Sequence, residues 1–402
     1  MTRRQHPAPH APPSRADGDA KTRADGEAPS KRPRVARVDH ARGLAIFLVV
    51  VGHVVGGLAA SGIPGDHLSE ALHSLHLKNS FRMPALFFIA GVFIERGLRK
   101  GLGTFVREKA GDLLYPYFLW NLLVWGLIDL AHFVGNVFGR KLVNTPPTDW
   151  WIVIKSLYHP IGTWFLYALF ATMLLYALLR KAGVRIHVLL ALGLVMHVAA
   201  RLGLVDDIEM LFQLGRLFPY LCLGAILSDW LLRVGLNAPL WKPIVVTVAS
   251  AALLAWLSSL PIMSSAVPLP SSPDAAADTD AALLVLRAQR IPFRIAIALC
   301  GIAALWALAI VFERLAGPRL VQYWGRISME VYIASGMGMV ASRIILVNLG
   351  VSQAWILILA GITAGMAFPM ILVWLVRFTG FNYLFRWGKP SAAYPLPQTA
   401  PT

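Results

Sequence analysis

Charged residues and cysteines are scarce in this 402-residue chain. Only 14% of the residues are charged, and Asp and Glu together number 21, whereas soluble proteins typically carry about a quarter charged residues. The two cysteines, Cys222 and Cys300, each lie within an apolar run. They form neither a disulfide framework nor a metal-ligand spacing, and we expect both to be buried packing residues. The composition therefore excludes an ordinary soluble domain.

Long apolar runs make up much of the chain. The chain is 57% hydrophobic with a mean hydropathy of +0.61, and runs of about 20 residues, enough to cross roughly 30 Å of hydrocarbon, recur along it. These features predict an all-α integral membrane protein, one bundle of about ten transmembrane helices. The predicted segments are 42–60, 72–95, 112–134, 162–180, 186–203, 209–229, 243–261, 292–313, 327–348 and 354–377.

The basic residues indicate the orientation of this bundle. The formal net charge is +16, but Lys and Arg gather in the N-terminal tail and in short loops, which favours topology and anionic lipid over nucleic acid as the explanation. Alternate loops are the more basic ones, within 96–109, 180–185, 233–242, 314–326 and 377–389. The positive-inside rule then places both termini in the cytoplasm. We expect a bacterial inner membrane; the oligomeric state is left open.

The ends of the chain differ from its middle. Residues 1–36 are rich in Ala, Pro, Arg and Asp and predict a disordered cytoplasmic tail, followed by a transmembrane domain over 37–388 and a second disordered tail over 389–402. A signal peptide ending near residue 60 is the alternative, but its polar lead would be too long and its core would contain His53. The segment 261–282 predicts a mobile outer loop.

The first apolar segment carries two ionisable residues on one face. Arg42 and His53 are eleven residues apart, which in a helix places them within about 20° of each other and roughly 16 Å apart along the axis. Asp39 lies near the same face or caps the helix start. Two interpretations stay open: Arg42 is a topology anchor and His53 bonds a neighbouring helix, or this face lines a cavity in which neutral His53 is available as a base.

The second segment favours the cavity. Arg82 lies thirteen residues before Glu95, which is predicted to lie at the cytoplasmic edge. This spacing places Arg82 about 20 Å from that surface, a depth comparable to that of His53 on the antiparallel neighbour. Two ionisable residues at matching depth on consecutive helices predict a shared polar interior.

With these residues in view, the sequence resembles the acyltransferase-3 family of integral-membrane O-acyltransferases over roughly residues 37–388. The matching stretches are “DHARGLAIFLVVVGH”, “FRMPALFFIAG”, “GTWFLYAL”, “FPYLCLGAIL” and “WGRISMEVYIASG”. The closing “FNYLFRWGKP” is similar to members described as fucose 4-O-acetylase-related, which indicates a sugar acceptor. Three departures, at Ala90, Ala110 and Ser335, concern secondary contacts.

The resemblance implies acyl transfer from a cytoplasmic acyl-CoA, expected to be acetyl-CoA, to a hydroxyl of a carbohydrate or glycolipid. It implies that His53, Arg42 and Asp39 are the catalytic group, with His53 as general base and Asp39 orienting or balancing Arg42. A covalent acyl-histidine and direct transfer both remain open. Arg42, Arg99 and Arg107 are expected to bind the coenzyme phosphates, although positive-inside topology alone would also place Arg99 and Arg107 there.

Five further residues are expected to bind substrate. Arg82 would stabilise the oxyanion or bind the acceptor, and Trp164 offers an aromatic face to a sugar ring. Ser328 and Tyr332 share one helix face, whereas Glu330 points away by about 160° and is expected to pair with another helix.

Two other function classes stay open, a transporter of a polar solute and a non-catalytic scaffold. A transporter would move solute along a gradient without consuming acyl-CoA. No metal is expected, because the remaining histidines lack the spacing of a metal site. His187 and His197 in particular are interpreted as having no charged companion at helical spacing.

Overall fold

The computed structural model of the chain describes residues 35–61, 81–137, 146–156, 162–234, 238–264 and 276–387. Within these ranges every regular element is helical. From Ala36 onward the chain is one compact unit. Apart from residues 35 and 36, the predicted tail 1–36 lies outside the described residues, as does the tail 389–402.

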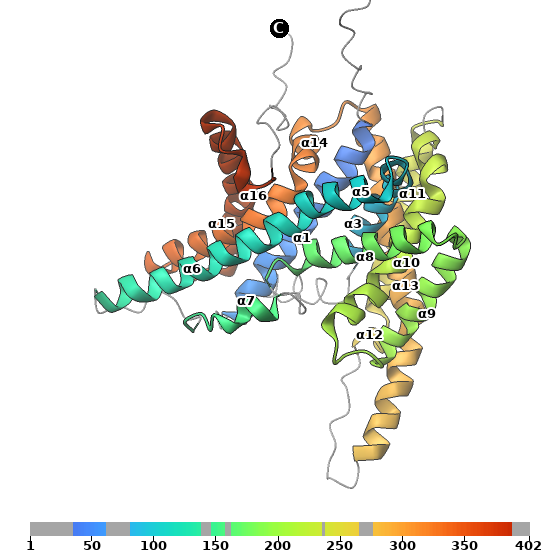
Figure 1. Cartoon of the computed structure of the whole chain (residues 1–402), viewed down its shortest axis with the longest axis horizontal. Helices are drawn as coiled ribbons and strands as arrows, with labels where there is room; N and C mark the ends of the chain where they lie inside the picture. Colours follow the sequence, from blue (N-terminus) through green and yellow to red (C-terminus); the bar gives the residue numbers. More distant parts are fainter. Residues whose placement is uncertain are drawn as a thin grey trace, which may run out of the picture. The chain divides into compact units, whose positions relative to one another are not determined.

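The helices follow one another without strands in the described part of the chain. They are α1 (Ala36–Ala60), α3 (Arg82–Gly91), α4 (Ile94–Leu98), α5 (Leu102–Lys109), the π-helical turn η1 (Ala110–Leu114), α6 (Tyr115–Val137), α7 (Trp151–Lys155), α8 (Trp164–Lys181), α9 (Ile186–Leu202), α10 (Glu209–Arg233), α11 (Trp241–Ser259), α12 (Pro261–Ser264), α13 (Ala276–Arg314), α14 (Arg319–Arg326), α15 (Ser328–Asn348), α16 (Ala354–Thr379) and the 3-10 turn η3 (Asn382–Leu384) (Figure 1).

The prediction of an all-α membrane bundle is confirmed. Eight helical stretches among the described residues are long and apolar enough to cross a membrane, and α3 and α9 are shorter apolar helices. Each of the ten predicted segments contains one of these helices. Many large apolar side chains on them are exposed, such as Phe133 at 66% and Val248 at 63%. Such a surface is suited to contact with lipid rather than with water.

Two boundaries differ from the prediction. The segment predicted over 72–95 is broken in its described part, because α3 ends at Gly91 and α4 begins at Ile94. The prediction of a loop over 261–282 is wrong at both ends, where α12 and the first turns of α13 are helical. The part of α13 before the predicted segment 292–313 includes Ala281, Leu284 and Arg287, which are all good helix formers. The helix therefore begins well before the apolar run.

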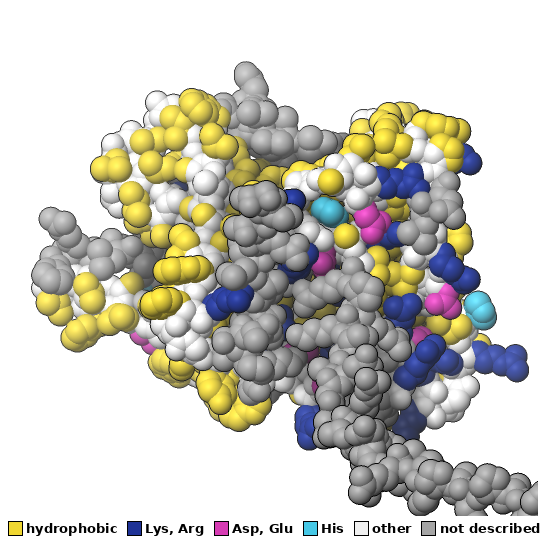
Figure 2. Space-filling model, turned by 90° about the horizontal axis from the view of Figure 1, so that it is seen from above, with side chains coloured by type: hydrophobic (Ala, Val, Ile, Leu, Met, Phe, Trp, Pro, Cys, Tyr) yellow, Lys and Arg dark blue, Asp and Glu magenta, His cyan; other side chains and the backbone are white. Residues whose placement is uncertain are grey.

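Helix α1 lies at the centre of the bundle. It packs against α3, α13, α14, α15 and α16, and its Ala45, Ile46 and Val50 are almost fully buried. Its start is fixed to the end of α13 by an ion pair of 2.7 Å between Arg37 and Glu313. The N-terminal end of α1 and the C-terminal end of α13 therefore lie at the same end of the bundle, together with α14 (Figure 1). Lys and Arg side chains gather on this end, which is the one predicted to be cytoplasmic (Figure 2).

Paired glycines allow two helix contacts to be unusually close. A Cβ on Gly91 of α3 would lie 2.1 Å from the carbonyl oxygen of Leu221, and a Cβ on Gly224 of α10 would lie 2.0 Å from that of Phe88. The two glycines thus let α3 and α10 touch backbone to backbone, as small residues do between membrane helices. Gly43 of α1 and Gly325 of α14 make a second contact of this kind. These contacts give the glycines of the matching sequence stretches a structural reason.

Alanine at Gly224 is expected to destabilise the protein by about 1–3 kcal/mol, because a Cβ cannot fit there unless α3 and α10 move apart. Gly336 of α15 has nothing within 4 Å of its own added Cβ, so Gly336→Ala serves as the control and should leave stability unchanged or raise it. Thermal unfolding of both purified variants in detergent measures the difference. Equal midpoints for Gly224→Ala and the native chain would contradict this account of the contact.

Candidate active site

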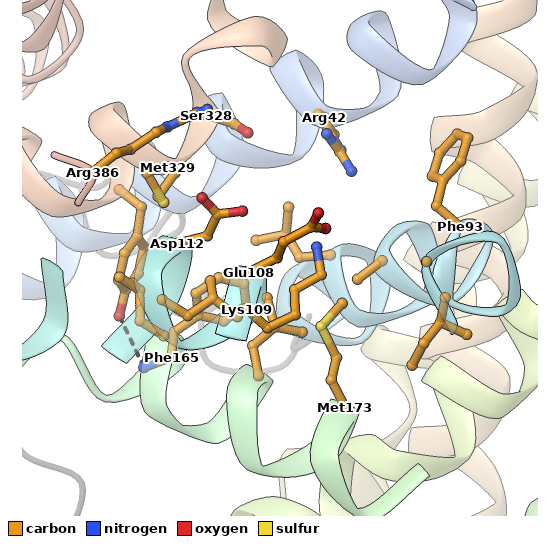
Figure 3. A pocket seen from close by; sticks show the side chains of 18 of the residues that line it. Arg42, Phe93, Glu108, Lys109, Asp112, Phe165, Met173, Ser328, Met329 and Arg386 are labelled. Carbon is orange, nitrogen blue, oxygen red and sulfur yellow. Dashed lines mark hydrogen bonds between the residues drawn. The ribbon is translucent and has the colours of Figure 1, made fainter. Parts of the chain in front are cut away.

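A cavity of about 500 Å³ opens beside the N-terminal half of α1. This volume is in the range of small-molecule sites. Its walls come from α1, α3, α4, α5, η1, α8, α14, α15 and the segment after η3 (Figure 3). Six basic and three acidic residues line it, namely Arg42, Arg96, Lys100, Lys109, Arg326, Arg386, Glu108, Asp112 and Glu330. We call it the first cavity; its lining is basic overall, which suits an anionic ligand.

Two guanidinium groups from different helices meet at one aromatic ring in this cavity. Arg42 of α1 lies 5.9 Å from the centroid of Phe93, and Arg96 of α4 lies 5.8 Å from the same centroid. The break between α3 and α4 places Phe93 between them, and Figure 3 shows Arg42 and Phe93 at the same end of the cavity. Arg42 was predicted to belong to the site, and it lines the cavity.

Ion pairs connect the other walls. Lys100 and Glu108 pair at 3.0 Å across the α4–α5 turn, and Arg326 pairs with Asp39 at 3.4 Å. Both partners of the second pair are largely buried, with side-chain exposures of 13% and 10%. Asp39 therefore connects the start of α1 to the end of α14, three residues before Arg42.

The start of α15 supplies the third wall. Ser328, Glu330 and Tyr332 all line the cavity, although helix geometry alone separates Glu330 from the other two. All three residues can line the cavity because they lie in the first two turns of α15, where the cavity meets the end of the helix. The Tyr332 hydroxyl accepts a hydrogen bond of 3.3 Å from the Phe165 amide of α8, drawn dashed in Figure 3.

Glu330 has a partner, as its place in an apolar segment predicts. Its side chain is 1% exposed, and its Oε1 accepts a hydrogen bond of 3.1 Å from Nη2 of Arg386. Arg386 follows η3, so the partner comes from the C-terminal segment and not from a transmembrane helix. Oε2 of Glu330 is buried and has no hydrogen-bond partner among the described residues.

His53 lies deeper along the same face of α1. It follows Ile46, which lines the first cavity, by seven residues, or about 10 Å along the axis. Its side chain is exposed and is not part of the cavity lining. Arg82 is close enough for its charge to act on the imidazole, and its Nη1 donates a hydrogen bond of 3.3 Å to the Leu48 carbonyl of α1. The structure thus brings His53 and Arg82 near each other, as their predicted depths indicate.

Four predicted binding residues lie outside the lining of the first cavity, namely Arg82 and three others. Arg99 and Arg107 are exposed and do not line the cavity; Arg96, Lys100 and Lys109 from the same segment do. Trp164 is not in the lining either, and its ring lies 5.7 Å from the guanidinium of Arg216. The aromatic face that was predicted to contact a sugar is in contact with this cation.

A second polar site was missed from the sequence. Arg201 of α9, Arg216 of α10 and Arg294 of α13 lie within electrostatic reach of one another. The statement that His197 has no charged companion is wrong, because Arg201 follows it by four residues on the same helix face. The Nδ1 atom of His197 also lies 3.1 Å from the Arg216 carbonyl oxygen. The four-residue spacing of His197 and Arg201 is the sequence pattern that could have indicated this second site.

The chemistry of the first cavity is that of anion binding. Guanidinium groups bind phosphate through two parallel hydrogen bonds, which makes arginine suited to phosphorylated ligands. Among the described residues no group of three His, Cys, Asp or Glu side chains could hold a metal ion.

Comparison with known proteins indicates a family for this chain. The sequence model of a family described as acyltransferase domain matches residues 35–374. A curated relative, the nodulation protein NolL of Mesorhizobium japonicum, is 31% identical over 140 residues, which is 34% of this chain and 34% of the relative. The chain thus aligns with about a third of the length of that relative. No solved structure matches the chain at a significant level.

Proposed function

This chain belongs to the acyltransferase-3 family and is a multi-pass membrane acyltransferase, and we propose that it moves an acetyl group from cytoplasmic acetyl-CoA to a hydroxyl of a cell-surface sugar or glycolipid. The observation that carries this proposal is the basic first cavity, which lies beside the face of α1 that also bears His53. The expected location is the bacterial inner membrane.

The donor is expected to enter the first cavity with its phosphates toward Arg42 and Arg96. These two guanidinium groups converge on Phe93 from separate helices, so a phosphate between them can receive hydrogen bonds from both. Lys109, whose Nζ lies 5.9 Å from the Phe105 centroid, adds positive charge nearby. The thioester would then extend along α1 toward His53.

His53 acts as the general base in this proposal. Its neutral imidazole accepts the proton of the acceptor hydroxyl, and the oxygen then attacks the thioester carbonyl. A carbon–oxygen bond forms and the carbon–sulfur bond breaks; the coenzyme thiolate leaves and receives the proton from the imidazolium. Arg82 is placed to stabilise the negative charge on the carbonyl oxygen. In the covalent alternative the imidazole nitrogen attacks first, and labelled acetyl-CoA without acceptor would leave the acetyl group on His53.

Substitutions of Arg96 and Arg99 distinguish a role in phosphate binding from a role in membrane orientation alone. Arg96→Ala is expected to raise the KM for acetyl-CoA by about 10- to 150-fold, because a charged hydrogen bond contributes about 1.5–3 kcal/mol. Arg99→Ala should change it less than about twofold, because Arg99 lies outside the cavity lining. Initial rates at varied donor concentration measure both. Equal effects of the two substitutions would mean that positive charge on this segment acts only through topology.

Reconstitution tests the proposal against the transporter alternative. Purified protein in liposomes is given labelled acetyl-CoA outside and a glycolipid extract of the host membrane. We expect coenzyme A release that depends on the extract and transfers label to it. Movement of the sugar or glycolipid across the liposome membrane without coenzyme A release would favour the transporter.

A further inference from the structure

We propose that a second cavity, at the opposite end of the bundle from the first, binds a phosphate group carried by a membrane lipid or by a soluble phosphate. This cavity of about 480 Å³ lies between the end of α9, the start of α10 and the first half of α13. Its polar lining consists of Arg201, Arg287, Arg290, Arg294, Asp206 and Glu209. The assignment concerns binding alone and does not depend on acyl transfer.

Helix α13 separates the second cavity from the end of the bundle where α1 begins. Glu313, near its C-terminal end, pairs with Arg37 at the start of α1, which is the end where the first cavity opens. Arg290 lies 23 residues earlier in the same helix, or about 35 Å along it. This exceeds the roughly 30 Å of a hydrocarbon core. In Figure 1 the first half of α13 lies at the end of the bundle opposite to α14. A ligand of the second cavity would therefore approach from the other membrane face.

The acidic residues of this cavity already have partners. Asp206 forms an ion pair of 3.3 Å with Arg287, and Glu209 accepts a hydrogen bond from the side-chain amide of Gln213. Arg290 donates to the Ile262 carbonyl at 2.8 Å. The charge of Glu209 also acts on Arg216 of α10. Four arginines of the lining and Arg216 therefore face only these two carboxylates, which leaves positive charge to be balanced.

Arg201 and Arg294 carry that charge. Neither forms an ion pair with any described residue, and the buried Nε of Arg201 has no hydrogen-bond partner among them. Arg216 adds a third positive charge within reach of both, held over the rings of Phe212 and Trp164 at 5.3 and 5.7 Å. These three arginines are partly buried, and positive charge that is removed from water without enough anionic partners is unfavourable, so this group is suited to a bound anion.

The shape and chemistry of the lining favour phosphate on a lipid. Guanidinium forks match the oxygens of phosphate, which offers enough acceptors for two or more arginines at once. The apolar part of the lining, Phe212, Leu283 and Leu286, gives a hydrocarbon chain a surface to contact. The neighbouring Leu284 and Val285 of α13 are 45% and 55% exposed and continue this apolar surface outward.

Native mass spectrometry of the full chain tests the assignment. The probes are dioctanoyl phosphatidic acid, dioctanoylglycerol, which lacks only the phosphate, and inorganic phosphate. We expect phosphatidic acid to bind and dioctanoylglycerol not to compete with it. Inorganic phosphate that binds as tightly as phosphatidic acid would identify a soluble phosphate as the source, whereas weaker binding would identify a lipid headgroup. Equal binding of dioctanoylglycerol and phosphatidic acid to the native chain would overturn the proposal without any variant.

Variants locate the binding. Replacing both Arg201 and Arg294 with glutamine should weaken phosphatidic acid binding at least about 10-fold, because two charged hydrogen-bonding groups are lost. The control is Arg233→Gln, an exposed arginine at the other end of α10, which should bind as the native chain does. Arg201→Lys keeps the charge but removes the fork and is expected to weaken binding less than the double substitution. Unchanged binding in the double variant would place the phosphate elsewhere and refute the site.

Discussion

Replacing His53 with alanine is expected to lower the rate of acetyl transfer by about 10²–10⁴-fold, the contribution typical of a general base. The protein should stay folded, because the His53 side chain is exposed and contributes little to the packed core. The KM for acetyl-CoA should change little, because His53 is not part of the lining of the first cavity. Steady-state kinetics on purified, reconstituted protein separate the two parameters.

His187→Ala provides the matched control. His187 is also an exposed histidine in an apolar helix, but it lies on α9, away from Arg82 and the first cavity. We expect its removal to leave kcat unchanged. If His53→Ala retained native kcat, His53 would not act as the base and the proposed mechanism would be wrong. An equal loss in His187→Ala would indicate general damage.

Removing Arg386 is expected to destabilise the fold by about 3–5 kcal/mol, because it leaves the buried carboxylate of Glu330 without its cation. The variant is Arg386→Met, which keeps an unbranched apolar stem and removes the guanidinium. Adding Glu330→Gln to it should restore most of the lost stability, since no buried charge is then left uncompensated. Thermal unfolding of the single and double variants in one detergent measures the difference.

The Lys100–Glu108 pair is the control for this experiment. It has a similar length, 3.0 Å, but its side chains are 58% and 39% exposed, so Lys100→Met should change stability by no more than about 1 kcal/mol. An Arg386→Met variant as stable as Lys100→Met would show that Glu330 is protonated or finds another partner. In that case Glu330 would not need Arg386.

Much of the fold could be predicted because hydrophobic length is a local property. Each of the ten segments required only an apolar run of sufficient length, and each contains a helix. The break after Gly91 could not be predicted in this way. It accompanies a backbone contact with α10, which depends on Gly224, over a hundred residues away. Helix α13 is longer than predicted for another reason, since residues with high helix propensity extend it before the start of the apolar run.

Part of the lining of the first cavity could be predicted from the sequence. Arg42, Ser328, Glu330 and Tyr332, which were predicted to bind coenzyme or substrate, all line this cavity, and each lies in a stretch that resembles the family. The choice between Arg96 and Arg99 depends on how α4 is rotated after the break. Neither that rotation nor the contact of Trp164 with Arg216 can be predicted from the residues nearby in the sequence.

Mass spectrometry of surface polysaccharide and glycolipid tests the central claim most directly. Cells that lack this protein are complemented with the native chain or with His53→Ala at matched expression. We predict that an acetyl mass increment disappears on deletion and returns only with the native chain, which would also identify the acceptor. Full restoration by His53→Ala would contradict the role of His53, and the absence of any acyl increment that depends on the protein would contradict the proposed transfer to a surface sugar or glycolipid.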